Sequence, residues 1–276
     1  MGIISKVCGS LEARISQPRL RLLRTIYFNL RTLPLKQAVK LPVFIYGKVR
    51  LFMLNGSVEF KSTEIKRGMV KIGINGDSFN LSDGSGFISL TSTESKIIFN
   101  GPARIAVNSK IRVVADGVLT LGKNVRIGTG AIVVCNGGRI DIGDYTGITW
   151  GCVVMNSSFH NVYDSNKGGY VNPTRDIYIG SFCWVGNRST VYAGAYVPDD
   201  TICAATSYVN KNFKELEGVK NLLGGTPAKK IGEGQSRVFS PHLELELYNW
   251  FKNNPQTNIL VTTEKFDDFS AIAIEM

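Results

Sequence analysis

The sequence has very few histidines, and this scarcity limits its chemistry. Only His160 and His242 occur among 276 residues, so a zinc site with three histidine ligands is excluded. The GxxxxGK(S/T) phosphate-binding loop and the GxSxG hydrolase motif are both absent from the sequence. We therefore expect neither a metal cofactor nor one of these two enzyme classes.

Long hydrophobic runs are also missing. No uninterrupted apolar stretch approaches the ~20 residues that a membrane-spanning helix needs. Five arginines between positions 14 and 31 interrupt every apolar stretch near the start, so a secretory signal is not expected. The five cysteines form no CxxC pair and are odd in number, which favours reduced, mostly buried thiols. Together these features predict a cytoplasmic protein.

Acidic residues are nearly absent from the first part of the chain. Residues 1–50 contain ten Lys or Arg and one acid, Glu12, so they hold +9 of the total charge of +10. The rest of the chain carries only +1, so a basic body that binds nucleic acid is not expected. The positive charge is instead concentrated in a predicted N-terminal arm, residues 1–43.

The arm contains a predicted amphipathic helix. Arg21, Arg24 and Arg31 group on one side of it. The opposite face carries five apolar side chains, those of Leu22, Leu23, Ile26, Tyr27 and Leu30. Such an apolar face either packs on and caps the open edge of a sheet or lies on an anionic bilayer. Capping is favoured slightly, and a peripheral contact with the inner face of the membrane stays open as the alternative.

The most informative feature of the sequence is a six-residue repeat. Aliphatic anchors recur at every sixth position in three blocks: Leu121, Ile127, Val133; Ile142, Ile148, Val154; and Ile179, Val185, Val191, Val197, Cys203, Val209. In the last block, small residues stand four positions after the anchors, from Cys183 to Ser207. Neither the 3.6-residue period of a helix nor the two-residue period of a strand produces this spacing.

A short strand followed by a corner, repeated many times, does produce the spacing. Three such strands close a triangular coil of about 18 residues, which stacks on the next coil at the ~4.8 Å distance between paired strands. The repeat thus predicts an all-β parallel β-helix over residues 44–232, with residues 44–118 forming earlier, less regular coils. A β-sandwich would instead show alternating strands at about 8–12-residue spacing.

Part of the repeat resembles a known family. The run Ile179–Gly186 (IGSFCWVG), the hexapeptides after it and Gly224–Lys229 (GGTPAK) resemble the hexapeptide-repeat acyltransferases, especially bacterial sugar and polysaccharide O-acetyltransferases. The likeness covers roughly residues 100–232. It implies a left-handed β-helix, a homotrimer with active sites between neighbouring subunits, and acetyl-CoA as the acyl donor.

His160 is the candidate catalytic base. It stands where the anchor after Val154 is due, and the repeat then lapses over residues 161–176 and resumes at Ile179. The resemblance implies that this excursion reaches over a neighbouring subunit and that His160 takes a proton from the acceptor hydroxyl. Residue counting alone leaves a structural histidine at a loop entrance as the alternative. Asp144, near one coil earlier, is a candidate for orienting the imidazole.

The resemblance also assigns a donor site. The matched positions are those of Trp184, Asn187, Ala205, Asn210, Lys211 and Lys229. The first two would line the pantetheine groove, the backbone of the third would meet the cofactor amide, and the last three would lie near the nucleotide. The family's Gly-Ala-Gly-Ser stretch reads Ala204–Ser207 here, so the groove is expected to be narrower. A second departure is that the family's Thr-Lys pair reads Asn-Lys. The two lysines could instead be solvated surface charges.

The predicted C-terminal extension, residues 233–276, contains a short helix over Pro241–Asn253, with His242 as a surface residue near its start. Apolar residues alternate with polar ones in parts of residues 257–276. Overall we predict an acetyl-CoA-dependent O-acetyltransferase acting on a sugar hydroxyl of a surface polysaccharide or its precursor. Two alternatives stay open, an N-acetyltransferase of an amino sugar and a non-catalytic β-helix scaffold that binds glycan or partner subunits.

Overall fold

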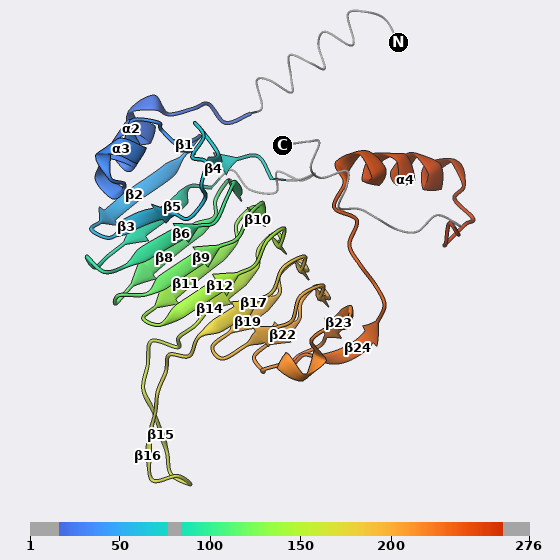
Figure 1. Cartoon of the computed structure of the whole chain (residues 1–276). Helices are drawn as coiled ribbons and strands as arrows, with labels where there is room; N and C mark the ends of the chain where they lie inside the picture. Colours follow the sequence, from blue (N-terminus) through green and yellow to red (C-terminus); the bar gives the residue numbers. More distant parts are fainter. Residues whose placement is uncertain (1–16, 77–83, 262–276) are drawn as a thin grey trace, which may run out of the picture. The chain divides into compact units, whose positions relative to one another are not determined.

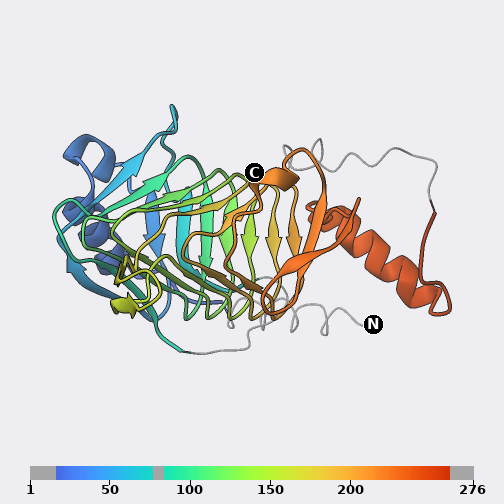
Figure 2. The ribbon, with the colours of Figure 1, turned by 90° about the horizontal axis from the view of Figure 1, so that it is seen from below.

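The computed structural model describes residues 17–76 and 84–261. By its internal contacts the chain divides into two units, Met1–Gln235 and Ser236–Met276. The first unit contains stacked coils whose strands form three sheets, parallel apart from the last strand of one sheet (Figures 1 and 2). The second unit contains one described helix, α4 (Pro241–Asn253), in agreement with the helix predicted there.

Successive strands of a coil belong to different sheets. The first sheet contains β1 (Val43–Ile45), β4 (Val70–Ile74), β7 (Ala103–Ala106), β10 (Val125–Ile127), β13 (Gly147–Ile148), β18 (Trp184–Val185), β21 (Ile202–Cys203), β23 (Asn221–Gly224) and β24 (Lys229–Glu233). The second contains β2 (Val49–Leu54), β5 (Gly86–Leu90), β8 (Lys110–Val114), β11 (Ile132–Asn136), β14 (Val153–Met155), β19 (Thr190–Tyr192) and β22 (Tyr208–Val209). The third contains β3 (Ser57–Phe60), β6 (Lys96–Phe99), β9 (Val118–Leu121), β12 (Arg139–Ile142), β17 (Ile177–Ile179) and β20 (Tyr196–Val197).

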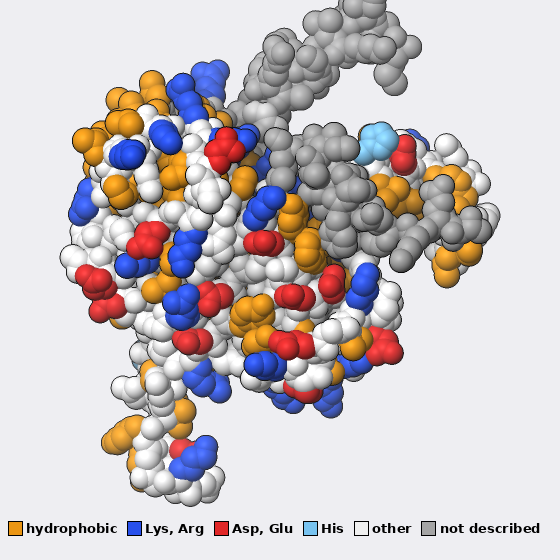
Figure 3. Space-filling model, viewed as in Figure 1, with side chains coloured by type: hydrophobic (Ala, Val, Ile, Leu, Met, Phe, Trp, Pro, Cys, Tyr) orange, Lys and Arg blue, Asp and Glu red, His pale blue; other side chains and the backbone are white. Residues whose placement is uncertain are grey.

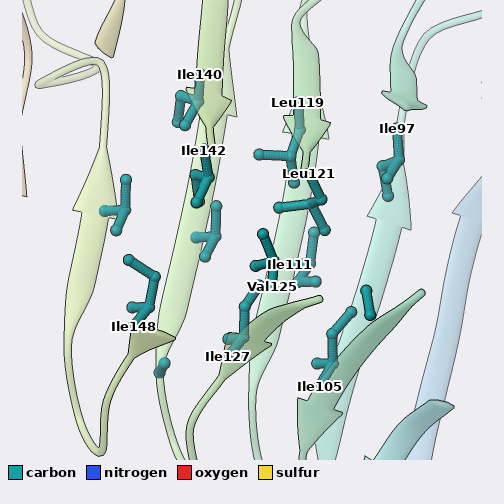
Figure 4. Close-up of a cluster of buried hydrophobic side chains, with 14 of the residues drawn as sticks. Ile97, Ile105, Ile111, Leu119, Leu121, Val125, Ile127, Ile140, Ile142 and Ile148 are labelled. Atoms are coloured by element: carbon teal, nitrogen blue, oxygen red, sulfur yellow. The ribbon is translucent and has the colours of Figure 1, made fainter. Parts of the chain in front are cut away.

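The strand register stacks the predicted anchors directly on one another. Ile127 pairs with Ile148, which pairs with Val185, which in turn pairs with Cys203. All twelve anchors are at most 2% exposed, and Figure 4 shows several of them lining the interior of the coils. Each fully buried aliphatic side chain contributes roughly 1.5–3 kcal/mol. The predicted all-β fold class, a parallel β-helix of hexapeptide repeats, is confirmed.

The earlier coils belong to the same stack, as predicted. Strands β1 to β8 pair in parallel with the later strands of the three sheets. Two register shifts interrupt these pairings, one between Phe52 and Leu54 and one between Ile72 and Ile74. The residues between them, Met53 and Gly73, both have positive φ. An extra residue in a strand breaks a six-residue count, which explains why the repeat is hard to see before residue 119.

Two helices cover the first coil, α2 (Leu22–Thr32) and α3 (Leu35–Ala38) (Figure 1). The buried Asn29 amide donates to the carbonyl of Val43 at 2.7 Å and accepts from its N–H at 3.1 Å. The hydroxyl of Thr25 accepts from the N–H of Ile45 at 3.0 Å. Side chains of α2 thus satisfy backbone groups at the open edge of β1, as a cap must.

The prediction that the apolar face of this helix packs on the first coil is wrong. The buried residues of α2 are Thr25, Phe28, Asn29 and Thr32. Leu23 is 84% exposed, and the other four residues of the predicted apolar face are also exposed. The physical reason is that an open strand edge presents N–H and C=O groups, which polar side chains can satisfy and leucines cannot.

The lapse in the repeat is an ordered β-hairpin, formed by β15 (Val162–Asp164) and β16 (Gly169–Val171). It projects away from the end of β14 (Figure 1). After β22, a short 3-10 helix (Lys214–Leu216) leads into β23 and β24, which pair antiparallel. Residues 262–276 of the predicted alternating tail lie outside the described residues. None of the helices described here is long and apolar enough to cross a membrane.

Candidate active site

The site is best described by the corners of the coils. At the first corner the chain passes from the first sheet to the second, and at the second corner from the second sheet to the third. At the third corner it returns to the first sheet. The excursion leaves from the second corner, because it connects β14 of the second sheet with β17 of the third.

The base of the excursion is built from buried polar side chains. Asn156 and Ser157 are both fully buried. The side-chain oxygen of Asn156 accepts from the N–H of Asn136 at 2.8 Å, and its side-chain nitrogen donates to the carbonyl of Gly137 at 2.8 Å. On the returning limb, the N–H of Arg175 donates to the backbone carbonyl of Asn156 at 2.9 Å. Both limbs of the excursion are therefore fixed to the preceding coil.

His160 lies three residues beyond this base, and its backbone is fixed by local hydrogen bonds. The N–H of Phe159 donates to the Ser157 hydroxyl at 3.1 Å, and the Ser158 hydroxyl donates to the carbonyl of His160 at 3.0 Å. The His160 side chain is exposed, and its imidazole forms no hydrogen bond with any residue in the described part of the chain. The ring is therefore accessible to an acceptor molecule from solvent.

Asp144 does not orient this imidazole within one chain. It lies at the third corner, between β12 and β13. Its carboxylate accepts from the N–H of Lys123 at 2.7 Å, which is a structural contact between coils. The prediction that Asp144 orients the imidazole rested on sequence distance. It does not hold within one chain, because residues about one coil apart in sequence can lie at different corners.

The hairpin presents apolar and aromatic side chains to solvent. Tyr170 is 80% exposed, and its ring packs edge-on against that of Tyr163 at 5.2 Å between centroids. Phe159, Val162 and Val171 are exposed as well. Isolated exposed apolar residues are common on protein surfaces, but a cluster of this kind marks a contact surface.

Four of the predicted donor residues lie along the first sheet and the first corner. Trp184 is in β18 and 36% exposed. Asn187 and Ala205 occupy equivalent corner positions, two residues after the anchors Val185 and Cys203, and both are exposed. Lys229 is exposed at the start of β24.

Two serines fix the corner at Ala205. The Ser189 hydroxyl donates to the carbonyl of Ala204 at 2.9 Å and accepts from the N–H of Ser207 at 3.1 Å. Within the described residues, the N–H of Ala205 has no acceptor. This N–H of an exposed residue can therefore bind the carbonyl oxygen of a ligand without losing a bond made in the fold.

The other two predicted donor residues lie elsewhere. Asn210 and Lys211 follow β22 at the second corner, and the N–H of Tyr196 donates to the carbonyl of Lys211 at 3.1 Å. The side-chain oxygen of Asn210 is buried and has no hydrogen-bond partner among the residues described. One chain therefore brings Asn210 and Lys211 to the corner of His160, but it does not bring them to Trp184, Asn187 and Ala205.

Sequence reasoning missed a cation at the first corner. The Arg188 guanidinium lies over the Trp150 ring, 4.3 Å from its centroid. Trp150 stands two residues after the anchor Ile148, which is the corner position that Asn187 and Ala205 occupy one and two coils later. The same hexapeptide count could have found this pair.

The four cysteines that the structure describes do not supply a nucleophile. Cys135, Cys152, Cys183 and Cys203 are free and buried, as predicted. Burial raises the pKa of the Cys135 thiol to about 12, so it stays protonated and unreactive at neutral pH. The part of the chain that the structure describes contains no group of three or more His, Cys, Asp or Glu able to hold a metal ion.

Comparison with known proteins gives one informative relative. No family model matches the chain. A polysialic acid O-acetyltransferase of Neisseria meningitidis is 28% identical over 80 residues, which cover 29% of this chain and 37% of that protein. The chain thus matches little more than a third of the relative's length. The resemblance to bacterial polysaccharide O-acetyltransferases noted in the sequence is confirmed.

Three solved structures are more distantly similar. They are the polySia-specific acetyltransferase NeuO (20% identity, TM-score 0.44, 82% of this chain and 91% of that chain) and the polysialic acid O-acetyltransferase OatWY (20%, 0.40, 74% and 95%). The third is a mutant of the N-acyltransferase AntD from Bacillus cereus, in complex with dTDP and coenzyme A (16%, 0.43, 77% and 89%). At TM-scores below 0.5, these likenesses carry no weight for activity or substrate.

Proposed function

We propose that this chain is an acetyl-CoA-dependent O-acetyltransferase that acts on a sugar hydroxyl of a surface polysaccharide or its precursor. The observation that carries the proposal is the position of His160. Its backbone is fixed beside buried Asn156 and Ser157, while its imidazole is open to solvent. The relative's activity, O-acetylation of polysialic acid, gives the acceptor class.

In the proposed reaction His160 acts as the general base. The imidazole removes the proton of the sugar hydroxyl while the oxygen attacks the thioester carbonyl of acetyl-CoA. A new C–O bond forms, the C–S bond breaks, and the leaving thiolate takes the proton from the imidazolium. A positioned general base contributes about 10²–10⁴-fold in rate. Histidine is the side chain that most often serves as a positioned general base.

Acetyl-CoA would bind along the first corner. The N–H of Ala205, which has no acceptor among the described residues, can donate to an amide carbonyl of the pantetheine, and the partly exposed Trp184 ring offers an apolar wall beside it. The exposed Lys229 and the Arg188 guanidinium place positive charge on the same side of the molecule. Cations near the phosphates of coenzyme A would favour binding electrostatically.

The separation of His160 from the donor residues at the first corner supports a site shared between copies of the chain. His160, Asn210 and Lys211 lie at the second corner, and Trp184 and Ala205 lie on or beside the first. A homotrimer that places the second corner of one copy against the first corner of the next would unite them. The exposed Phe159, Tyr163 and Tyr170 side chains would then be covered by the neighbour.

Replacement of the base tests the proposal. The purified chain is incubated with acetyl-CoA and a panel of polysialic acid and other bacterial glycans, and released coenzyme A is measured with a thiol reagent. His160→Ala should lower kcat by about 10²–10⁴-fold without changing the oligomeric state. His242→Ala is the matched control, because His242 is exposed and lies outside the proposed site, with its Nδ1 3.5 Å from a carboxylate oxygen of Glu246.

Three results would contradict the proposal in different ways. Near-full activity of His160→Ala would exclude the histidine as base. A folded oligomer without measurable coenzyme A binding would support the scaffold alternative. An acetylated product that survives mild alkali is an amide rather than an ester, so it would identify an N-acetyltransferase.

A further inference from the structure

Among the residues that the structure describes, no side chain covers an apolar surface on helices α2 and α3. Leu22, Leu23, Ile26, Tyr27 and Leu30 of α2 are between 36% and 84% exposed. Leu35, at the start of α3, and Val39, just after its end, are 70% and 66% exposed. We call these seven side chains the apolar face. The opposite side of α2 already packs on the first coil through Phe28 and Asn29, so the coil does not cover this face.

Positive charge surrounds the apolar face. Residues 17–58 contain eight basic residues and no acid: Arg19, Arg21, Arg24, Arg31, Lys36, Lys40, Lys48 and Arg50. None of the eight forms an ion pair with a carboxylate in the described residues. Figure 3 shows apolar and basic side chains gathered together over α2 and α3. The surface therefore combines apolar area with uncompensated positive charge.

A groove lies beside the apolar face, and basic residues line it. It has a volume of about 600 Å³, and its walls include Arg21, Leu22, Arg24, Lys48 and Arg50. One guanidinium N–H of Arg24 donates to the carbonyl of Val49 at 2.7 Å, which holds this cation at the groove. Lys48 and Arg50 are exposed. We call this the basic groove.

We infer that this end of the molecule docks on an anionic phospholipid bilayer. The apolar face would enter the boundary between headgroups and acyl chains, and the basic groove would receive a lipid phosphate. An amphipathic helix with basic flanks lies in the membrane interface in this manner, and α2, with 11 residues, is too short to span it. The inference goes beyond the proposed function and does not depend on it.

Charge favours a bilayer over a second copy of the chain as the occupant. Two copies meeting through this face would bring two clusters of eight basic residues together, with no acid in residues 17–58 to offset them. Like charges placed against each other oppose association. A membrane that contains anionic lipids has the opposite charge, and each basic residue near its surface raises the affinity by about 5-fold.

Flotation of the full chain with lipid vesicles tests the inference. We expect the protein to float with vesicles of phosphatidylcholine and phosphatidylglycerol at low salt, and to stay unbound with phosphatidylcholine alone. High salt should release part of it. These comparisons of lipid and salt use the unchanged protein, so they remain decisive even if a substitution disturbs folding.

Two variants separate the contribution of the basic groove from that of the apolar face. The double substitution Lys48→Gln and Arg50→Gln should weaken binding by about 30-fold. Leu23→Gln with Tyr27→Gln should weaken it at both salt concentrations. The matched controls are Lys110→Gln with Arg112→Gln, exposed on β8, and Leu245→Gln with Tyr248→Gln, exposed on α4; both should bind like the unchanged protein.

Five results would overturn the inference. These are equal recovery with neutral and anionic vesicles, recovery with neither, and equal binding by the Lys48/Arg50 variant and its control. The fourth is self-association without vesicles that Leu23→Gln with Tyr27→Gln abolishes, which would identify a second copy as the occupant. Inorganic phosphate that competes fully with anionic vesicles at low concentration would also reject a bilayer-specific site.

Discussion

The hydroxyls of Ser157 and Thr174 are hydrogen-bonded 3.1 Å apart, and this contact closes the base of the excursion that carries His160. The Asn136 amide also donates to the Ser157 hydroxyl at 3.1 Å. The pair thereby joins the outgoing limb, the returning limb and the preceding coil. A flexible-looking polar segment of the sequence is consequently anchored at a fully buried residue only three positions before the proposed base.

Ser157→Ala should impair catalysis without removing the base. The substitution leaves the Asn136 amide and the N–H of Phe159 without their acceptor, so stability should fall by about 1–3 kcal/mol. We expect a lower free energy of unfolding in urea together with a lower kcat. Ser165→Ala, at the exposed tip of the same hairpin, is the control. Unchanged kcat and stability in Ser157→Ala would show that the contact is dispensable.

Gly186→Ala should destabilise the coils at the first corner. A Cβ at Gly186 would lie 2.6 Å from the carbonyl oxygen of Cys203 and 2.7 Å from the nitrogen of Ala205, so the two coils would have to separate. Overpacking of this kind costs about 1–3 kcal/mol. Thermal unfolding should show a lower Tm and coenzyme A affinity should fall. The control is Gly169→Ala, because the nearest atom to a Cβ added at Gly169 is 4.0 Å away. This variant should leave Tm unchanged. Similar losses of Tm in both variants would contradict the close-packing explanation.

The buried thiols predict a loss of stability at alkaline pH. Burial raises the pKa of Cys135 and of Cys203 from 9.0 to about 12 in the folded chain. The unfolded chain ionises these thiols near its ordinary pKa, so their contribution is present below about pH 9 and is lost as the pH rises toward 12. Urea unfolding between pH 7 and pH 11 should show this decline.

A thiol reagent provides an independent check on the same residues. In a Cys8→Ser background, the native protein should react slowly at pH 8 and the unfolded protein should expose four thiols, those of Cys135, Cys152, Cys183 and Cys203. Rapid labelling of the native protein would mean that the interior is accessible.

The later coils could be predicted from sequence because one physical rule fixes them. Every sixth side chain must fill the interior, and the anchors from Leu121 to Val209 obey this without an insertion inside each block. The earlier coils contain bulges at Met53 and Gly73, which shift the count. Sequence periodicity is therefore informative only where each strand has the same length.

The site was predictable only in part. The lapse after Val154 identified the excursion, but nothing in the sequence indicated that it is a hairpin with the exposed Tyr163 and Tyr170 rings. The orientation of α2 was mispredicted because its packing follows the unpaired backbone groups of β1, and hydrophobicity alone does not encode them. The donor residues lie at two different corners, which depends on how the strands of successive coils pair and was not predicted from the sequence.

The most direct test of the shared site is complementation between two inactive variants. His160→Ala lacks the base, and Ala205→Trp should block the donor corner, where the exposed Ala205 can carry a larger side chain without disturbing the core. If each site combines His160 of one copy with Ala205 of another, equal amounts of the two variants, unfolded and refolded together, should recover about a quarter of the unmodified activity by random assortment. No recovery in mixed oligomers, with the unmodified protein refolding to full activity, would show that both residues must belong to the same chain and would contradict the account.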